Sequence, residues 1–182
     1  TDQQQITLLD ANRAEVIAQS EAVYQVRDMD LTSQADGMFF IAEDAEGELA
    51  LYTLDESGQV LVTTGQSIQA QIDREGDYIV YSVRDEQQEY TVFSYNISRQ
   101  QSTEIVRGQD IRISLVDELG RVFIAQQNGD EMTISSADED GSDLVTLFRD
   151  EDTYHGIIYY HPEHQGVIIY TQNNNGETSI FY

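Results

Sequence analysis

Short apolar runs alternate with polar turns along the whole chain. No stretch of 11 or more residues has apolar side chains at helical spacing, so the sequence predicts strands. The segment 37–54, GMFFIAEDAEGELALYTL, has a nearly continuous apolar run (38–42), a polar turn with Gly47, and an alternating run from Leu49. The continuous run predicts a strand that is buried on both faces, and the alternating run predicts a strand nearer the rim.

This unit recurs along the chain. Glycines that precede the apolar runs, which we interpret as turn residues, lie 39, 44 and 46 residues apart, at Gly37, Gly76, Gly120 and Gly166. After each apolar run come a polar turn, a third strand, a second polar turn and a fourth strand. Four short antiparallel strands in each period of about 40 residues are typical of a propeller blade. A β-sandwich, which also has strands at regular spacing, is the alternative.

The sequence therefore predicts an all-β protein, a β-propeller of about four four-stranded antiparallel blades within a single region, 1–182. Blades are predicted at 21–64, 65–108 and 109–149, with a half blade at 1–20 and an incomplete blade at 150–182. Residues 14–19 match a fourth strand and would complete the last blade, but residues 6–10 would then duplicate its third strand. We therefore expect an open partial ring, or a segment of a larger propeller, rather than a closed four-bladed ring.

Several motifs resemble the repeats of TolB-type β-propellers, which also occur in propeller domains of prolyl oligopeptidase-like and tricorn-like proteases. The matching residues are Asp36-Gly37, Leu51 to Asp55 with Gly58, and Ser135, Ala137 and Asp138 with Gly141 and Leu144. The Ser-Pro that usually precedes Asp-Gly is present only as His161-Pro162-Glu163, and the tryptophan before it is missing.

The resemblance implies a non-enzymatic protein-interaction or scaffold module with a protein partner. It also implies an extracytoplasmic location, periplasmic or on the cell surface, in a bacterium. The alternative that it implies is an accessory propeller that gates a larger hydrolase, in which case the natural chain would continue into a region with a catalytic serine.

Charge narrows the choice of partner. The chain has 34 Asp and Glu against nine basic residues, all of them arginine, and its formal net charge is −25. Binding to nucleic acid or anionic lipid depends on Lys and Arg, so we expect neither partner. The carboxylates of such an acidic surface repel one another, which implies screening salt, bound cations or a cationic partner. A solvated surface adapted to a saline habitat is the simplest explanation.

Other features of the composition bound the class of protein. The chain has no cysteine, which excludes disulfides and thiolate metal sites and leaves the compartment open. No run of 18 apolar residues is present, so we expect no membrane insertion. The sequence has neither a starting methionine nor a basic-then-apolar leader. We expect that a leader has been removed or that this is a piece of a longer sequence.

One candidate metal site lies in the turn 138–143, DEDGSD. Its carboxylates Asp138, Asp140 and Asp143 are the candidate Ca²⁺ ligands of a cation- or carbohydrate-binding propeller, because Ca²⁺ takes six to eight oxygen ligands. The turn lacks the closing glutamate and the flanking helices of an EF-hand. We therefore expect an ordinary turn between the third and fourth strands.

Two further groups lie near the C-terminus. His155, His161 and His164, with Glu163, are residue types that bind zinc, but His161 and His164 occupy a place that other repeats fill with turn residues. We expect turn residues there rather than a metal site. Tyrosines, which suit binding surfaces, also cluster in this last unit, where packing between blades is the simpler role; they are Tyr154, Tyr159, Tyr160, Tyr170 and Tyr182.

No catalytic pattern stands out. The sequence has no G-x-S-x-G elbow, no cysteine nucleophile and no Gly-rich phosphate loop after a strand. We expect no enzymatic activity and no cofactor for this chain.

Overall fold

The fold is described from a computed structural model. The described residues are 4–10, 13, 15–32, 36–43, 47–73, 75–116, 119–151, 153–161, 166–173 and 175–181.

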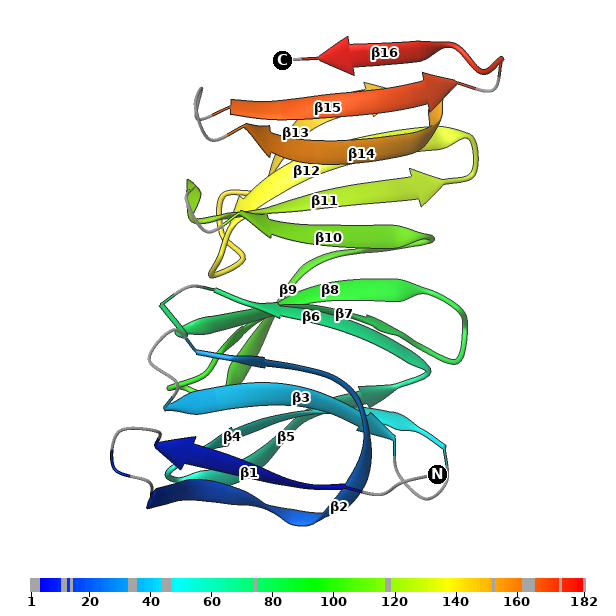
Figure 1. Ribbon diagram of the computed structural model, residues 1–182. Helices are drawn as coiled ribbons and strands as arrows, with labels where there is room; N and C mark the ends of the chain where they lie inside the picture. Colours follow the sequence, from blue (N-terminus) through cyan, green and yellow to red (C-terminus); the bar gives the residue numbers. More distant parts are fainter. Residues whose placement is uncertain are drawn as a thin grey trace.

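Strands that follow one another in sequence pair antiparallel and form four sheets (Figure 1). The first sheet has five strands in sequence order: β1 (Gln4–Asp10), β2 (Glu15–Leu31), β3 (Gly37–Glu43), β4 (Leu49–Asp55) and β5 (Gly58–Gly65). We call the second part of β2, from Gln25, together with β3, β4 and β5, blade 1. The first part of β2 pairs with β1, and we call these two the N-terminal hairpin.

The other three sheets are built in the same way. Blade 2 consists of β6 (Ser67–Ile72), β7 (Tyr78–Arg84), β8 (Tyr90–Asn96) and β9 (Gln101–Gly108). Blade 3 consists of β10 (Ile111–Val116), β11 (Arg121–Asn128), β12 (Glu131–Asp138) and β13 (Val145–Asp150). Blade 4 has three strands, β14 (Thr153–His161), β15 (Gly166–Asn173) and β16 (Thr178–Phe181).

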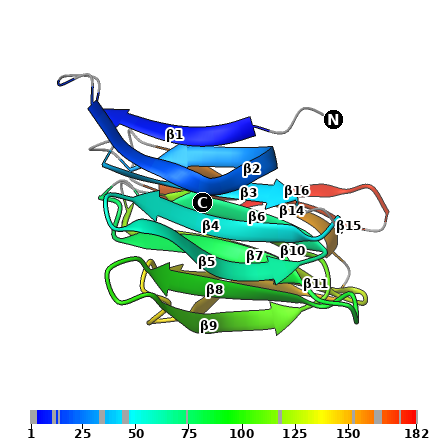
Figure 2. The ribbon, with the colours of Figure 1, turned by 90° about the horizontal axis from the view of Figure 1, so that it is seen from below.

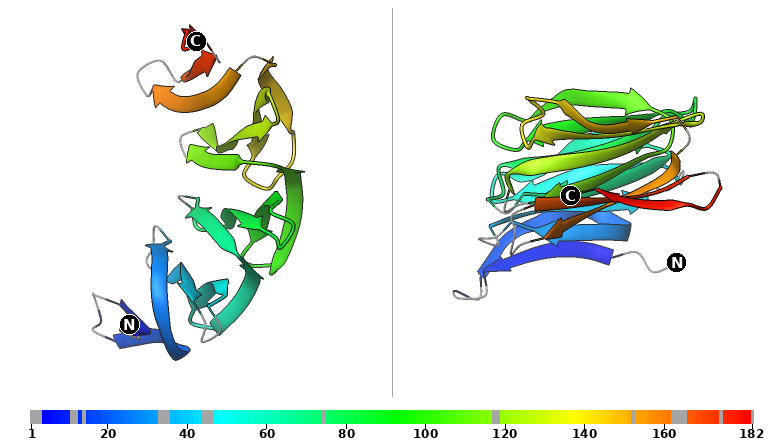
Figure 3. Two further views of the ribbon diagram at one scale, coloured as in Figure 1. Left: turned by 90° about the vertical axis from the view of Figure 1, so that its right-hand side faces the viewer. Right: turned by 90° about the horizontal axis from the view of Figure 1, so that it is seen from above.

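The sheets stack face to face along the chain, with their strands running across the stack (Figures 1 and 2). Seen from the side, the stack curves into an open arc, and the N-terminal hairpin and blade 4 form its two ends (Figure 3). The predicted all-β fold of propeller-like, four-stranded antiparallel blades is confirmed. The arrangement is a partial ring, as the duplicated third strand led us to expect.

Apolar side chains fill the space between neighbouring sheets. On one face of β3, Phe39 lies in a buried cluster with Ile79 of blade 2. On the other face, Phe40 lies in a separate cluster with Leu8 of β1. Val80 of β7 likewise packs towards blade 3, away from blade 1. The second strands β3, β7 and β11 are therefore covered on both faces, which explains their unbroken apolar runs.

Strand β2 differs from the prediction. The sequence predicted a fourth strand at 14–19 and a new blade from residue 21, but one strand runs from Glu15 to Leu31. It contains no glycine or proline that would interrupt it. Elsewhere the fourth strand of a blade is joined to the next first strand in nearly the same way, and only Gln66 separates β5 from β6.

The glycine register also differs from the prediction. Gly76 and Gly120 are turn residues with positive φ, +82° and +59°. Gly37 is instead the first residue of β3 and pairs with Asp55. The equivalent pairs in blades 2 and 3 are Tyr78 with Asn96 and Arg121 with Asp138. The prediction that Gly37 is a turn residue was therefore wrong, and the repeat is counted from these strand pairs.

Substitution of a residue between two sheets tests this core. Leu51 on β4 is fully buried between blades 1 and 2. We expect Leu51→Ala to lower the free energy of unfolding by about 3 kcal/mol, because it leaves a cavity where the sheets cannot close up. Leu61→Ala on β5, where the side chain is 55% exposed, should change it by less than about 0.5 kcal/mol. Urea denaturation measures both, and equal effects would contradict the packing between blades.

Candidate functional site

Turns from all of the blades are collected along two edges of the stack, because alternate turns of an antiparallel meander lie at the same end. One edge carries the turns that join first to second strands and third to fourth strands. We call this edge the turn face. Its described segments include 55–58, 75–78, 96–101 and 138–145.

A hollow of about 560 Å³ opens on the turn face where blades 1 and 2 meet the N-terminal hairpin. Among the described residues that line it are four carboxylates and one guanidinium: Asp10, Asp36, Asp55, Glu56 and Arg13. Arg13 lies 3.6 Å from Asp10, from Nε to Oδ2, in an exposed ion pair. The lining therefore has an excess of negative charge, which favours cationic groups.

The carboxylates of the hollow are held in place by the turns that carry them. Thr32 donates a hydrogen bond of 2.6 Å from its hydroxyl to Asp36 Oδ1. Asp55 Oδ1 accepts one of 2.7 Å from the backbone N–H of Ser57. Thr32 also lies under Gly76, where an added Cβ would meet its side chain at 2.9 Å. The turns of blades 1 and 2 are therefore in direct contact at the hollow.

The turn between the third and fourth strands is closed by its first residue in blades 1 and 2. Asp55 does this in blade 1, and Asn96 Oδ1 accepts a bond of 2.8 Å from the N–H of Arg99 in blade 2. In blade 3 the third residue of the turn takes this role, because Asp140 Oδ1 accepts from the N–H of Ser142 at 2.8 Å. The hydrogen bonds from the side chain and from the backbone N–H of Ser142 lower the pKa of Asp140.

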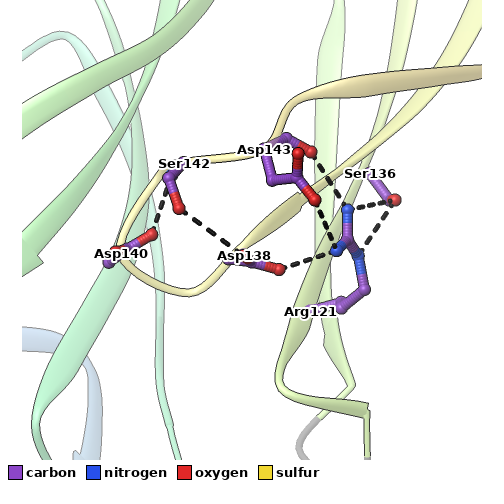
Figure 4. Close-up of polar contacts among 6 residues, drawn as sticks. All are labelled: Arg121, Ser136, Asp138, Asp140, Ser142 and Asp143. Carbon is purple, nitrogen blue, oxygen red and sulfur yellow. Dashed lines mark hydrogen bonds and ion pairs between the residues drawn. The ribbon is translucent and has the colours of Figure 1, made fainter.

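Asp138 binds Arg121 through Oδ1, while its Oδ2 accepts a longer hydrogen bond of 3.5 Å from the Ser142 hydroxyl (Figure 4). Arg121 Nη1 lies 2.6 Å from Asp138 Oδ1 and 3.9 Å from Asp143 Oδ2. Its Nε and Nη2 donate to Ser136 Oγ at 3.1 and 3.0 Å, and Nη2 also donates to the backbone carbonyl of Asp143 at 3.1 Å. One arginine thus ties the start of β11 to the end of β12 and to the acidic turn.

The acidic turn also contacts the neighbouring blade. Gly141 has φ +84°, and a Cβ there would lie 3.2 Å from Ile105 and 3.4 Å from Ser94, both in blade 2. The hydroxyl of Ser94 donates a hydrogen bond to the backbone carbonyl of Glu139. The turn 138–143 therefore joins blade 3 to blade 2.

The three candidate Ca²⁺ ligands are brought into one turn, but Arg121 lies between two of them. A guanidinium supplies positive charge to Asp138 and Asp143, and a metal ion would have to compete with it. Within the described residues, no group of three or more His, Asp or Glu is placed to hold a metal ion. Calcium binding stays a prediction.

The histidine and tyrosine clusters fall mostly outside the described side chains. His164, Glu163 and Tyr182 lie outside the described residues, and so do the side chains of the other candidates except two. Those two, Tyr160 and Tyr170, are half-buried. The zinc and tyrosine sites stay predictions.

No catalytic site is formed by the described residues. Their hydroxyl–carboxylate pairs, such as Ser57 with Asp55 and Thr32 with Asp36, close turns. In the part of the chain that the structure describes, no helix is long and apolar enough to cross a membrane.

Sequence reasoning missed Arg121 and the hollow. Arg121 follows a turn glycine at the start of a second strand, and counting the hairpin register back from the turn at Gly129 would have paired it with Asp138. The hollow offered no such signal. Its described lining residues come from five separate stretches of the chain, from Asp10 to Ile97, and only the stacking of sheets brings them together.

Comparison with solved structures bears on the fold. A putative TolB from Agrobacterium tumefaciens has a TM-score of 0.54 at 12% identity, over 86% of this chain and 65% of that one. The β-propeller domain of the Trilobed protease from Pyrococcus furiosus, which has an open velcro topology, has a TM-score of 0.56 at 11% identity, over 87% and 57%. The chain has the TolB-like β-propeller fold.

A chain of the nidogen/laminin complex is a further neighbour of this propeller segment, with a TM-score of 0.56 at 10% identity over 98% of this chain and 78% of that one. The segment spans less than two thirds of the lengths of the TolB and Trilobed protease propellers that it matches. No family model matches it. No curated protein matches it either.

The tie made by Arg121 can be tested by Arg121→Met, which keeps much of the apolar stem and removes the guanidinium. We expect the free energy of unfolding to fall by about 1 to 2 kcal/mol, because three acceptors lose a charged donor. Arg149→Met removes the pair with Glu131, in which the arginine side chain is 67% exposed, and should cost less than about 0.5 kcal/mol. Urea denaturation compares the two, and equal losses would contradict a special role for Arg121.

Proposed function

We propose that this propeller segment is a non-enzymatic protein-interaction module whose turn face binds a cationic surface of a partner protein. The observation that carries the proposal is the hollow of about 560 Å³, lined by four carboxylates and one arginine. A polar, strongly acidic hollow suits the Lys and Arg side chains of a protein surface.

The scaffold supports this role. The turns around the hollow belong to sheets that share buried apolar clusters, so the positions of the carboxylates are defined by the core. Loops on such a scaffold can vary without disturbing the packing between sheets. Preorganised acceptors lose little conformational freedom when a partner binds.

The comparisons add support from analogy. The neighbours include TolB proteins and a chain of a protein complex, nidogen with laminin. We place the protein outside the cytoplasm of a bacterium, periplasmic or at the cell surface, on the resemblance to TolB repeats. The acidic surface leads us to expect neither nucleic acid nor anionic lipid as a partner.

A second candidate is an accessory propeller that controls access to a hydrolase. Its support is the similarity to the propeller of the Trilobed protease and to acylaminoacyl peptidase from Pyrococcus horikoshii, of which this chain covers 32%. It requires that the natural polypeptide continue into a hydrolase region with a catalytic serine. The intact mass of the natural gene product distinguishes the two candidates.

The interaction proposal is tested by affinity capture on the immobilised chain from native cell extract in 50 mM KCl. We expect one partner in stoichiometric amount, released by 500 mM KCl because salt screens exposed charges. With that partner purified, Asp36→Asn combined with Glu56→Gln should raise Kd about tenfold, or about 1.4 kcal/mol.

The matched control is Glu86→Gln, which removes an exposed carboxylate from the opposite edge, in the turn between β7 and β8. It should leave Kd unchanged. Failure to recover any stoichiometric partner would count against an interaction module, and an equal effect of Glu86→Gln would place binding away from the turn face.

A further inference from the structure

The first strands of the blades carry apolar residues in one shared register. In each of blades 1 to 3, one apolar residue of the first strand pairs with the second residue of the strand that follows it. These pairs are Leu31 with Met38, Ile72 with Ile79, and Leu115 with Val122. Two positions earlier, the equivalent residues are Met29, Ala70 and Ile113. All six are apolar, so this face of each first strand is built to be covered.

Blade 2 is covered at these positions and blade 1 is not. Ala70 and Ile72 are 8% and 9% exposed, in the cluster that Phe39 of blade 1 shares with them. Met29 and Leu31 are 60% and 47% exposed. Two large apolar side chains are thus exposed at positions that, in blade 2, are covered by the second strand of the neighbouring blade.

A groove marks the place of that missing strand. It has a volume of about 540 Å³ and lies between β1 and the second part of β2, with Leu9, Met29 and Leu31 among its lining residues. In the described sheet, β1 is an edge strand and pairs only with β2. Its free edge therefore offers backbone groups to an incoming strand beside the groove.

The other end of the arc presents the matching surface. Ile169 of β15 is 7% exposed and packs towards blade 3. Ile168 and Tyr170 therefore lie on the opposite face of β15, the face that Phe39 and Ile41 occupy on β3. Ile180, which pairs with Tyr170, is 71% exposed.

The interface between blades 1 and 2 has two sides, and each end of the arc presents an equivalent of one of these sides. One end has the covering residues of a second strand, and the other has the first strand that such residues cover. In the left view of Figure 3 the arc is open on one side, and its two ends, the N-terminal hairpin and blade 4, lie on that side. A second arc facing the first would bring each end against its complement.

We propose that two copies of this chain associate head to tail and close into one ring. In each contact, β15 of one copy lies in the groove beside β1 of the other, with Ile168 and Tyr170 against Met29 and Leu31. The N-terminal hairpin then supplies the third and fourth strands of a composite blade whose first two strands are β14 and β15.

In this arrangement β1 takes the place next to β15 that β16 holds in a single copy. β16 has four residues, all of them exposed, and four pairing positions on β15. β1 has seven residues and buries Ile6 and Leu8 against blade 1. The exchange replaces a short edge strand with a longer one whose inner face is already packed, as in domain swapping.

Charge opposes this association and gives it a signature. Each copy has a formal net charge of −25, so two copies repel one another, and salt reduces that repulsion. Salt should therefore strengthen the apolar contact between copies, whereas it should weaken binding of a cationic partner to the turn face. The inference does not depend on the proposed function, and the two can fail separately.

The test is the molar mass of the purified 182-residue chain, by sedimentation equilibrium in 50 mM and 1 M KCl. We expect a species of about twice 20.6 kDa that is favoured at 1 M KCl. Met29→Asp should leave a monomer in both salts, because it puts a charge into the apolar contact. Leu61→Asp, at a residue 55% exposed on β5, should associate like the parent chain.

A mixing experiment tests the head-to-tail geometry. Tyr170→Asp alters only the covering end, so it should also be monomeric, with its fold checked by circular dichroism. Mixed with Met29→Asp, it should form a two-copy species through the one contact in which both ends are intact. If Tyr170→Asp is unfolded, Met29→Asp with the Leu61→Asp control decides the question.

A chain that stays monomeric in both salts overturns the proposal. So does association that Met29→Asp leaves intact or that Leu61→Asp abolishes equally. A mass that keeps rising with concentration overturns the closed ring, because it indicates an open filament.

Discussion

Burial of the second strands β3, β7 and β11 between two neighbouring sheets is the interaction on which the rest of the structure depends. Phe39 and Phe40, adjacent on β3, point into different clusters, one shared with blade 2 and the other with the N-terminal hairpin. No single sheet can bury both of its faces, so each needs a neighbour, as in other repeat proteins. Side chains such as Leu51, Val80 and Ile134 become fully buried only because the sheets stack. The stacking sets the spacing between blades and therefore the positions of all the turns.

The few basic residues of this acidic chain are largely used within it. Of the eight arginines among the described residues, five form ion pairs with Asp or Glu: Arg13, Arg27, Arg107, Arg121 and Arg149. Most of these pairs are exposed and contribute little to stability. Arg121 differs because its guanidinium serves several acceptors at once, from the end of β12 and from the turn that follows it. The excess carboxylates remain on the surface, and the hollow on the turn face gathers four of them.

The two surfaces singled out here differ in their chemistry because they arise differently. The turn face is made of loop ends, whose side chains are polar because they always meet water. The ends of the arc are made of strand faces whose pattern is that of a buried interface, with Met29 and Leu31 in the register of Ile72 and its neighbours. Exposed edges of this kind invite further strand pairing. Long-range charge acts on both surfaces, but burial of apolar area acts only on the second.

The sequence by itself determined the fold class, the four repeats and the partial ring, because apolar periodicity and turn residues are local signals that repeat. It also determined the acidic surface. The tertiary structure alone decided the register, in which Gly37 is a strand residue equivalent to Tyr78, and the continuity of β2. It also decided that Arg121 lies between Asp138 and Asp143. It brought Asp36 and Glu56 into one hollow with Arg13. It left Met29 exposed, although the equivalent residue of blade 2, Ala70, is buried. These facts depend on contacts between residues far apart in sequence, whose distances follow from how sheets stack and not from the pattern within any one strand.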